Sequence, residues 1–270
     1  MKYLQDISLV CVDCVSAQDA IKSMIKSMKL VRFEKNILFT SKLDSMKISC
    51  GKEGIIEIIN IHPINNMTEY CYFVMKELGT YIKDEFSHIL LVQSDSWVEK
   101  PEIWAEEFLQ YDYLGAPLIA HYNTVVQNGG FSLRSKKLCK FLSESPEILD
   151  FQDDVSICET YRNLLIYNGF KFAPKKLAEK FSREGSLGDI NGTFGQHSCG
   201  NGLYAGFDYH TGRKRFCWIS PPKKIFPIAT EKYPDEWAYQ IPNAIDLIDY
   251  KLTKEIYEEW KISLPEIPYK

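Results

Sequence analysis

The most informative absence in this 270-residue sequence is that of any excess of basic charge. Its 32 lysines and arginines are outnumbered by 36 aspartates and glutamates, which gives a net charge of −4. This balance argues against a protein whose whole surface binds nucleic acid. Long apolar runs are also missing: residues 7–12 form a short one that ends at Asp13, unlike a signal peptide or a membrane span. We therefore expect a cytoplasmic protein.

Cysteine is too infrequent for a disulfide scaffold in a chain of this size. The eight cysteines lie mostly in apolar stretches, where cysteine behaves as a small buried side chain. Cys11 and Cys14 have a spacing that serves zinc and redox sites, so a functional pair is one interpretation. The chain has no second such pair, and buried cysteines remain the preferred interpretation.

Apolar periodicity predicts the fold class. Strand-like runs alternate with segments of helical spacing, in an order that predicts an α/β fold with a mostly parallel central sheet flanked by helices. Ser16 is placed to cap the first helix. The expected strands are 7–12, 36–40, 55–61 and 88–95, and the expected long helices are 17–28 and 68–82.

Proline marks the expected division into domains. Seven of the twelve prolines lie beyond Ser220, which predicts extended polypeptide over residues 221–270. We expect residues 1–220 to form one domain and residues 221–270 to be a C-terminal extension packed on it.

Polar residues that follow the apolar run 89–92 form the first candidate site. A buried central strand that ends in a polar cluster typically opens onto a ligand-binding crevice. Asp95 at such a position can bind Mg²⁺ or Mn²⁺, because these cations prefer carboxylate oxygens combined with substrate phosphates. A plain turn or helix cap is the alternative interpretation.

Three further stretches carry candidate residues. Adjacent Gly129 and Gly130 within strand-like sequence indicate close approach of a ligand or another backbone, although an Asn-Gly hairpin turn is an alternative. Asp153 and Asp154 begin a helix, where acidic residues also occur simply because the helix dipole favours them. Six glycines surround His197 within residues 185–202, which predicts a mobile loop that closes over a substrate.

Taken in order, four motifs resemble a family of predicted glycosyltransferases of the GT-A type that is catalogued as a domain of unknown function. The resemblance covers roughly residues 5–200 and implies a single GT-A-like domain that binds a nucleotide sugar. Each motif is weak alone, and their shared order makes the match specific. The motifs are Gln93–Ser94–Asp95–Ser96, Asn128–Gly129–Gly130–Phe131–Ser132–Leu133–Arg134, Asp153–Asp154–Val155 with Cys158, and Phe194–Gly195 with His197.

The resemblance also implies a cofactor site. Gln93, Ser94 and Asp95 occupy the place of the family's D-x-D metal motif, with Gln93 replacing its first aspartate. Asp95 and His197 would then bind Mn²⁺ or Mg²⁺, while Asp13, Gln93 and Ser94 would contact the nucleotide-sugar donor. Since a divalent cation stabilises negative charge on a departing nucleotide, this ligand set suits sugar transfer.

The same resemblance assigns the acidic pair. Asp154 matches the carboxylate that acts as catalytic base, and Asp153 would bind the acceptor. Asn128, Gly129 and Gly130 would line the donor-sugar and acceptor side. A carboxylate within hydrogen-bond reach can accept the proton of an acceptor hydroxyl, and a neighbouring carboxylate raises its pKa.

We therefore expect a metal-dependent glycosyltransferase that uses a UDP-sugar with inversion and acts on a glycan, protein, lipid or modified nucleic acid. A nucleotidyltransferase or other sugar-nucleotide enzyme is an alternative, but it would need a glycine- and lysine-rich phosphate loop where residues 13–16 stand. Another is a non-catalytic carbohydrate- or nucleic-acid-binding module, because Arg213–Lys214–Arg215 precede Phe216 and Trp218. A solvated basic turn also explains that run.

Overall fold

The computed structural model describes residues 1–82, 86–117, 127–148, 152–184 and 192–197, together with 203–208 and 213–218. The chain forms two compact units, Met1–Cys199 and Gly200–Lys270. The expected domain boundary at residue 220 stays a prediction, and the expected extension 221–270 lies outside the described residues. Among the residues described, no helix combines the length and the hydropathy needed to cross a bilayer.

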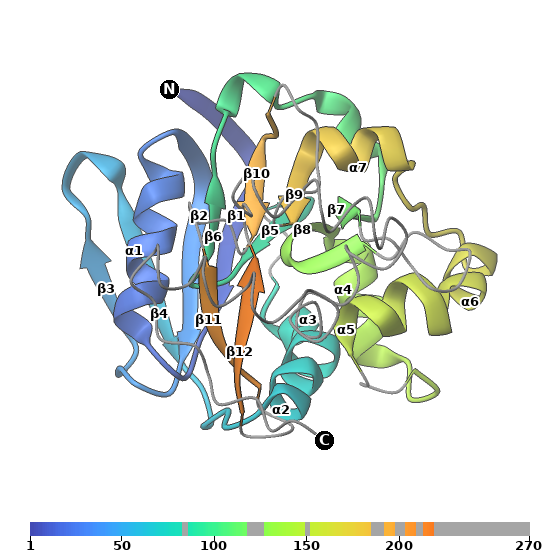
Figure 1. Cartoon of the computed structure of the whole chain (residues 1–270), viewed down its shortest axis with the longest axis horizontal. Coiled ribbons are helices and arrows are strands. Elements are labelled where there is room, and N and C mark those ends of the chain that lie inside the picture. Colours follow the sequence, from blue (N-terminus) through green and yellow to red (C-terminus); the bar gives the residue numbers. More distant parts are fainter. Residues whose placement is uncertain are drawn as a thin grey trace, which may run out of the picture. The chain divides into compact units, whose positions relative to one another are not determined.

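A seven-stranded sheet forms the centre of the first unit, in the order β3-β4-β2-β1-β5-β8-β7 (Figure 1). Four adjacent strands, β4, β2, β1 and β5, are parallel, whereas β3 and β8 pair antiparallel with their neighbours. The predicted α/β fold with a mostly parallel central sheet is therefore confirmed. The strands are β1 (Lys2–Val12), β2 (Val31–Thr40), β3 (Met46–Ser49), β4 (Ile55–Asn60), β5 (His88–Val92), β7 (Tyr113–Pro117) and β8 (Gln127–Ser135).

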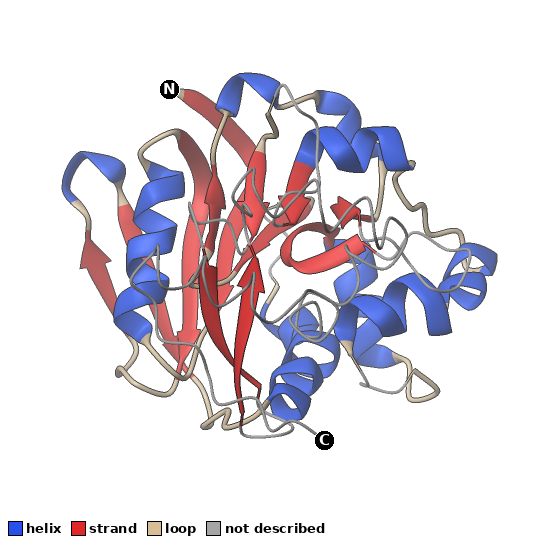
Figure 2. Cartoon of the chain, in the orientation of Figure 1, coloured by secondary structure: helices blue, strands red, loops and turns tan. Residues whose placement is uncertain are grey.

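Helices cover both faces of this sheet (Figure 2). On one face lie α1 (Ala17–Met28) and α7 (Lys175–Phe181). On the other lies one long helical segment, which comprises α2 (Met67–Tyr72), a π-helical stretch (Phe73–Glu77) and α3 (Leu78–Tyr81), followed by α4 (Lys136–Glu144). The remaining helices are α5 (Asp153–Val155), π-helical Ser156–Thr160, α6 (Arg162–Tyr167), and the 3₁₀ turns Gly51–Glu53, Pro101–Ile103 and Glu106–Gln110.

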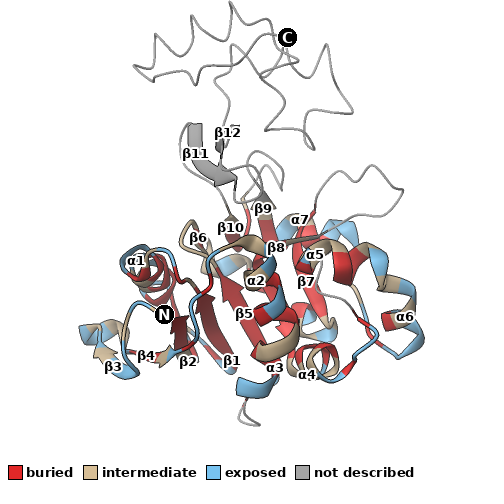
Figure 3. Cartoon of the chain, turned by 90° about the horizontal axis from the view of Figure 1, so that it is seen from below, coloured by how far each residue is buried: buried red, intermediate tan, exposed pale blue. Residues whose placement is uncertain are grey.

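Burial explains why β5 is apolar from Ile89 to Val92. All five of its residues are buried, because the strand is central and both of its faces are covered (Figure 3). Ile89 and Leu91 pack toward the α2–α3 side, while Leu90 and Val92 pack toward the α1 side. This alternation is that of any strand. The polar residues that follow β5 therefore emerge at the edge of a fully buried strand.

A second, three-stranded sheet joins segments that are far apart in the sequence. It contains β6 (Ser96–Val98), β10 (Gly195–His197) and β9 (Ser182–Glu184), in the order β6-β10-β9. In the antiparallel register of β6 and β10, His197 is opposite Ser96. The pairing therefore brings His197 beside the residues that follow β5.

Several alternatives from the sequence are corrected here. Gly129 and Gly130 lie within strand β8, so the hairpin-turn interpretation is wrong. Cys11 and Cys14 belong to different hydrophobic clusters, so they do not form a paired site. In the predicted loop 185–202, residues 185–191 and 198–202 lie outside the described residues.

The second unit contains one described hairpin. Strands β11 (Leu203–Asp208) and β12 (Arg213–Trp218) pair antiparallel along their full length. The basic run at 213–215 therefore belongs to a strand and not to a turn.

Candidate active site

The candidate residues lie where the order of the strands reverses. From β1 the chain continues to β2 and β4 on one side, and it returns to form β5 on the other side of β1. The carboxyl ends of β1 and β5 are adjacent, because Cys11 pairs with Val92. Asp13 follows β1, and Gln93 follows β5. Open α/β sheets bind ligands at such a reversal point.

A tight turn after β5 presents Gln93 and Asp95. The amide of Ser96 donates to the Gln93 carbonyl at 3.1 Å, and the Gln93 amide donates to the Ser96 hydroxyl at 2.7 Å. The same hydroxyl donates to the carbonyl of Gly130 at 2.7 Å. Ser23 of α1 donates to the carbonyls of Gln93 and Ser96 from the other side. These bonds fix the turn between α1 and β8.

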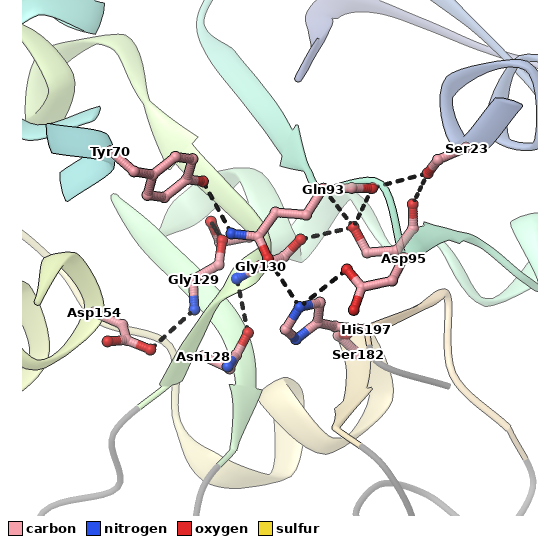
Figure 4. Close-up of polar contacts among 12 residues, drawn as sticks. Ser23, Tyr70, Gln93, Asp95, Asn128, Gly129, Gly130, Asp154, Ser182 and His197 are labelled. Carbon is pink, nitrogen blue, oxygen red and sulfur yellow. Dashed lines mark hydrogen bonds and ion pairs between the residues drawn. The ribbon is translucent and has the colours of Figure 1, made fainter. Parts of the chain in front are cut away.

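Asp95, Gln93 and His197 form one cluster, which we call the histidine cluster (Figure 4). His197 Nε2 lies 3.4 Å from Asp95 Oδ1 and 3.0 Å from Gln93 Oε1. The His197 and Asp95 side chains are only 12% and 22% exposed. The structure therefore brings together the two residues predicted to bind metal and adds the amide oxygen of Gln93.

Gly130 forms one wall of the histidine cluster. A Cβ atom at this position would overlap the His197 ring, so the imidazole packs directly against the backbone. The Gly130 amide donates to Asn128 Oδ1 at 2.7 Å, which turns the Asn128 side chain back onto its own strand. The predicted close approach at this glycine is thus made by a side chain of the protein.

Asp153 and Asp154 lie together at the start of α5, and we call them the acidic pair. Asp153 Oδ2 forms an ion pair with Nη2 of buried Arg134 at 2.5 Å. Asp154 Oδ2 instead accepts a hydrogen bond from the Gly129 amide at 3.3 Å. A Cβ atom on Gly129 would lie 2.8 Å from Asp153 Oδ2, so this glycine too permits a close approach.

The two carboxylates differ in their surroundings. Burial, followed by the negative charge of Asp153, raises the pKa of Asp154 to about 7. Hydrogen bonds from the amides of Val155 and Gly129 and the charge of Arg134 oppose this shift. A carboxylate with a pKa near neutrality is well suited to accept a proton in general base catalysis.

The remaining predicted residues have other contacts. Asp13 Oδ1 accepts hydrogen bonds from the amides of Val15 and Ser16 at 2.8 and 2.7 Å, which stabilises the turn into α1. Ser94 lies in the turn after β5, next to Asp95, and is half-buried. The carboxylate of Asp13 thus has a structural role at the carboxyl end of β1.

Two important neighbours were missed from the sequence. Gln93 Nε2 donates to the Tyr70 hydroxyl of α2 at 3.1 Å, and burial raises the pKa of that hydroxyl above its ordinary value. Arg134 is the second neighbour that was missed from the sequence. An arginine within the apolar pattern of a strand is itself a signal, because a buried charge needs a partner.

Figure 4 shows how the two clusters are related. Asn128, Gly129 and Gly130 lie between Asp154 on one side and Asp95 and His197 on the other. Successive residues of a strand face opposite ways, which is why adjacent glycines contact different clusters.

The histidine cluster fits a divalent cation. Two ligands that bind Mg²⁺ at right angles, each at about 2.1 Å, are separated by about 3.0 Å. The observed separations of 3.0 and 3.4 Å are close to this value. Carboxylate and amide oxygens with one imidazole suit Mn²⁺. In the part of the chain that is described, no three His, Cys, Asp or Glu side chains form a metal-binding group, so Gln93 and substrate oxygens would complete the shell.

Residues 56–197 match a family described as "Protein of unknown function (DUF5672)". No curated protein matches the chain significantly. Its fold is similar to solved glycosyltransferases. For the galactosyltransferase LgtC in complex with donor and acceptor sugar analogues, identity is 13%, coverage is 72% of this chain and 87% of that chain, and the TM-score is 0.45. For apo GlyE of Streptococcus pneumoniae TIGR4, identity is 11%, coverage is 96% of this chain and 64% of that chain, and the TM-score is 0.42. The likeness concerns the fold alone.

Proposed function

The chain belongs to the family of proteins of unknown function DUF5672, and we propose that it is a metal-dependent glycosyltransferase. It would transfer a sugar from a UDP-sugar to an acceptor hydroxyl of a glycan, protein, lipid or modified nucleic acid. One observation carries the proposal: Asp95 and Gln93 converge on His197 Nε2, at 3.4 and 3.0 Å. These groups lie at the strand-order reversal where α/β sheets bind ligands.

Gln93, Asp95 and His197 would hold Mn²⁺ or Mg²⁺ together with oxygens of the donor diphosphate. When bound, the cation supplies a Lewis acid that stabilises negative charge on the leaving nucleotide. The turn after β5 and the pairing of β6 with β10 keep Asp95 and His197 side by side. Preorganised ligands of this kind need little rearrangement when the donor binds.

Asp154 would act as the general base. The acceptor O–H bond breaks and its proton passes to the Asp154 carboxylate, while the acceptor oxygen forms a bond to the anomeric carbon of the donor. The bond between that carbon and the phosphate oxygen breaks, and its electron pair leaves with the nucleoside diphosphate. Attack from the side opposite the leaving group inverts the anomeric centre. A pKa raised to about 7 supports Asp154 in this role.

The remaining predicted residues would contact the donor. Asn128, Gly129 and Gly130 lie between the two clusters and would line the donor-sugar and acceptor side. Asp13 and Ser94 follow adjacent strands and are assigned to the nucleotide. These assignments extend the prediction from sequence motifs and are tested by the donor affinities of the individual variants.

The proposal is tested by a donor screen. The protein is incubated with UDP-, GDP- and CMP-sugars and Mn²⁺, nucleotide release is measured, and Asp154→Asn serves as the matched control. We expect release from one class of donor, and mass analysis of the product then identifies the acceptor. Release of pyrophosphate from nucleoside triphosphates would indicate a nucleotidyltransferase. Absence of nucleotide release with every donor would favour a non-catalytic binding module.

A further inference from the structure

Arg134 of β8 is the largest fully buried side chain of the described residues. Only 1% of its side chain is exposed, and Nη2 forms the ion pair with Asp153. Its Nε donates to the Ser132 hydroxyl at 2.9 Å, and the guanidinium lies 5.3 Å from the ring centre of Tyr113. Removal of one partner from such a buried pair is costly, because it leaves an uncompensated charge.

Gly129 links Arg134 to both members of the acidic pair. The Gly129 carbonyl accepts hydrogen bonds from the Ser132 hydroxyl at 2.9 Å and from Arg134 Nη2 at 3.5 Å. Its amide donates to Asp154 Oδ2 at 3.3 Å. Arg134 is therefore connected to Asp153 directly and to Asp154 through one residue of the strand.

We propose that Arg134 is a positioning residue that holds Asp153 as a charged, non-reacting carboxylate and so leaves Asp154 to accept the proton of the acceptor. The inference rests on the proposed function and deepens it by dividing the roles of the acidic pair. It replaces the expectation that Asp153 binds the acceptor. Asp153 is engaged by a buried cation, whereas in the described part of the chain Asp154 accepts its hydrogen bonds from the backbone amides of Gly129 and Val155.

Among the described residues, the other titratable groups that face the pair carry no charge near neutrality. They are Tyr70 and Cys71 of α2 and Tyr113 of β7, and burial raises the pKa of each, that of Cys71 to about 12. Two adjacent carboxylates without a counter-charge would compete for one proton. Within the described surroundings of the pair, Arg134 supplies the cation that breaks this symmetry.

A double-mutant cycle tests this division. Turnover and donor KM are measured against pH for wild type, Arg134→Gln, Asp153→Asn and the double variant. We expect Arg134→Gln to lower kcat at least about 10-fold with donor KM nearly unchanged, and to move the acid limb of the profile to higher pH, because Asp153 then acts on Asp154 uncompensated. Asp153→Asn should move the limb to lower pH. In that background Arg134→Gln should add less than about threefold, because its partner is already gone.

Two further variants separate positioning from a general loss of structure. Arg134→Lys keeps the charge and should restore part of the turnover. Arg162→Gln removes another guanidinium, which lies 4.2 Å from the Phe172 ring centre, and should leave the acid limb in place. Additive losses in the cycle, or an unmoved acid limb in Arg134→Gln, would overturn the proposal.

A readout without catalysis separates this inference from the proposed function. Thermal unfolding of the four proteins is followed at pH 5 and pH 8. Arg134→Gln should lose stability against wild type, because it leaves the Asp153 carboxylate without its buried counter-charge, and most of that loss should vanish in the Asp153→Asn background. This result with no transferase activity would leave the Arg134–Asp153 arrangement standing and the proposed function rejected. An equal loss from Arg134→Gln with and without the Asp153 carboxylate would reject the arrangement itself.

Discussion

The histidine cluster and the acidic pair lie on opposite sides of the same two glycines, yet they are built differently. In the histidine cluster, Gln93, Asp95 and His197 are one another's partners. In the acidic pair, Asp153 is anchored to a buried arginine. The first arrangement can exchange its internal contacts for a ligand, whereas the second is fixed when the chain folds. The proposed function thus assigns donor binding and proton transfer to separate groups of residues.

The largest effect is expected from a substitution in the acidic pair alone. Asp154→Asn should lower kcat about 10²–10⁴-fold, because general base catalysis typically contributes that much. Donor affinity, measured by calorimetry with UDP and Mn²⁺, should stay within twofold of wild type. Loss of donor binding in this variant would show that the two sides are not separable.

The second prediction concerns a substitution in the histidine cluster. Asp95→Ala should weaken donor binding in the presence of Mn²⁺ by about 10–100-fold, the range seen when groups that support a metal are removed. Exposed Asp44 offers a matched control, and Asp44→Ala should bind the donor as wild type does. Unchanged donor affinity in Asp95→Ala would contradict the assigned metal role.

The adjacent glycines allow a sharper comparison. In Gly130→Ala the new methyl group meets the His197 ring, so Mn²⁺ affinity should fall. In Gly129→Ala the methyl group meets the Asp153 carboxylate, so turnover should fall while Mn²⁺ affinity is kept. Calorimetry and kinetics on both variants check this. The same phenotype from both would show that the strand moves as one unit.

A smaller effect is expected on stability. The pKa of Asp154 is raised from 3.8 to about 7 in the folded state, so its contribution to stability is present below pH 4 and is lost as pH rises to about 7. Asp154→Asn should therefore melt a few degrees above wild type at pH 8 and no higher at pH 4. Melting temperatures measured across this range check the sign. An equal difference at both pH values would contradict the raised pKa.

The smallest effect is expected at Tyr70, which contacts the histidine cluster through Gln93. Tyr70→Phe removes one hydrogen bond, which is typically worth about 0.5–1.5 kcal/mol, or about 2–12-fold in affinity. Mn²⁺ affinity should fall within that range and the pH profile of turnover should not change. A shifted profile would place Tyr70 among the groups that act on the acidic pair.

Much of the fold could be predicted because burial leaves a clear pattern. The apolar run 89–92 is central and covered on both faces, and Ser16 does cap α1, accepting from the Asp19 amide. Strand β6 and strand β10 are three residues each, too short for any periodicity. Their pairing brings Asp95 and His197 together. The sequence therefore predicted this contact only through the order of the four motifs.

The candidate residues could be named from the sequence, but their connections could not. Asp95 was singled out by its place after a buried strand and His197 and Asp154 by the family resemblance, whereas the contacts of Arg134 and Tyr70 depend on which elements pack together. The same limit applies to Asp153 of helix α5, whose partner Arg134 lies 19 residues away on strand β8. Sequence motifs thus supplied the candidate residues, and only tertiary contacts showed that they form two separate clusters.

Binding of Mn²⁺ in the presence of UDP, followed by the electron paramagnetic resonance of the free ion, tests the central claim most directly. The free-ion signal should fall when wild type or Asp154→Asn is added with UDP, and should persist with Asp95→Ala or His197→Ala. Persistence of the signal with wild type, or its equal loss with all four proteins, would contradict a cation site at the histidine cluster.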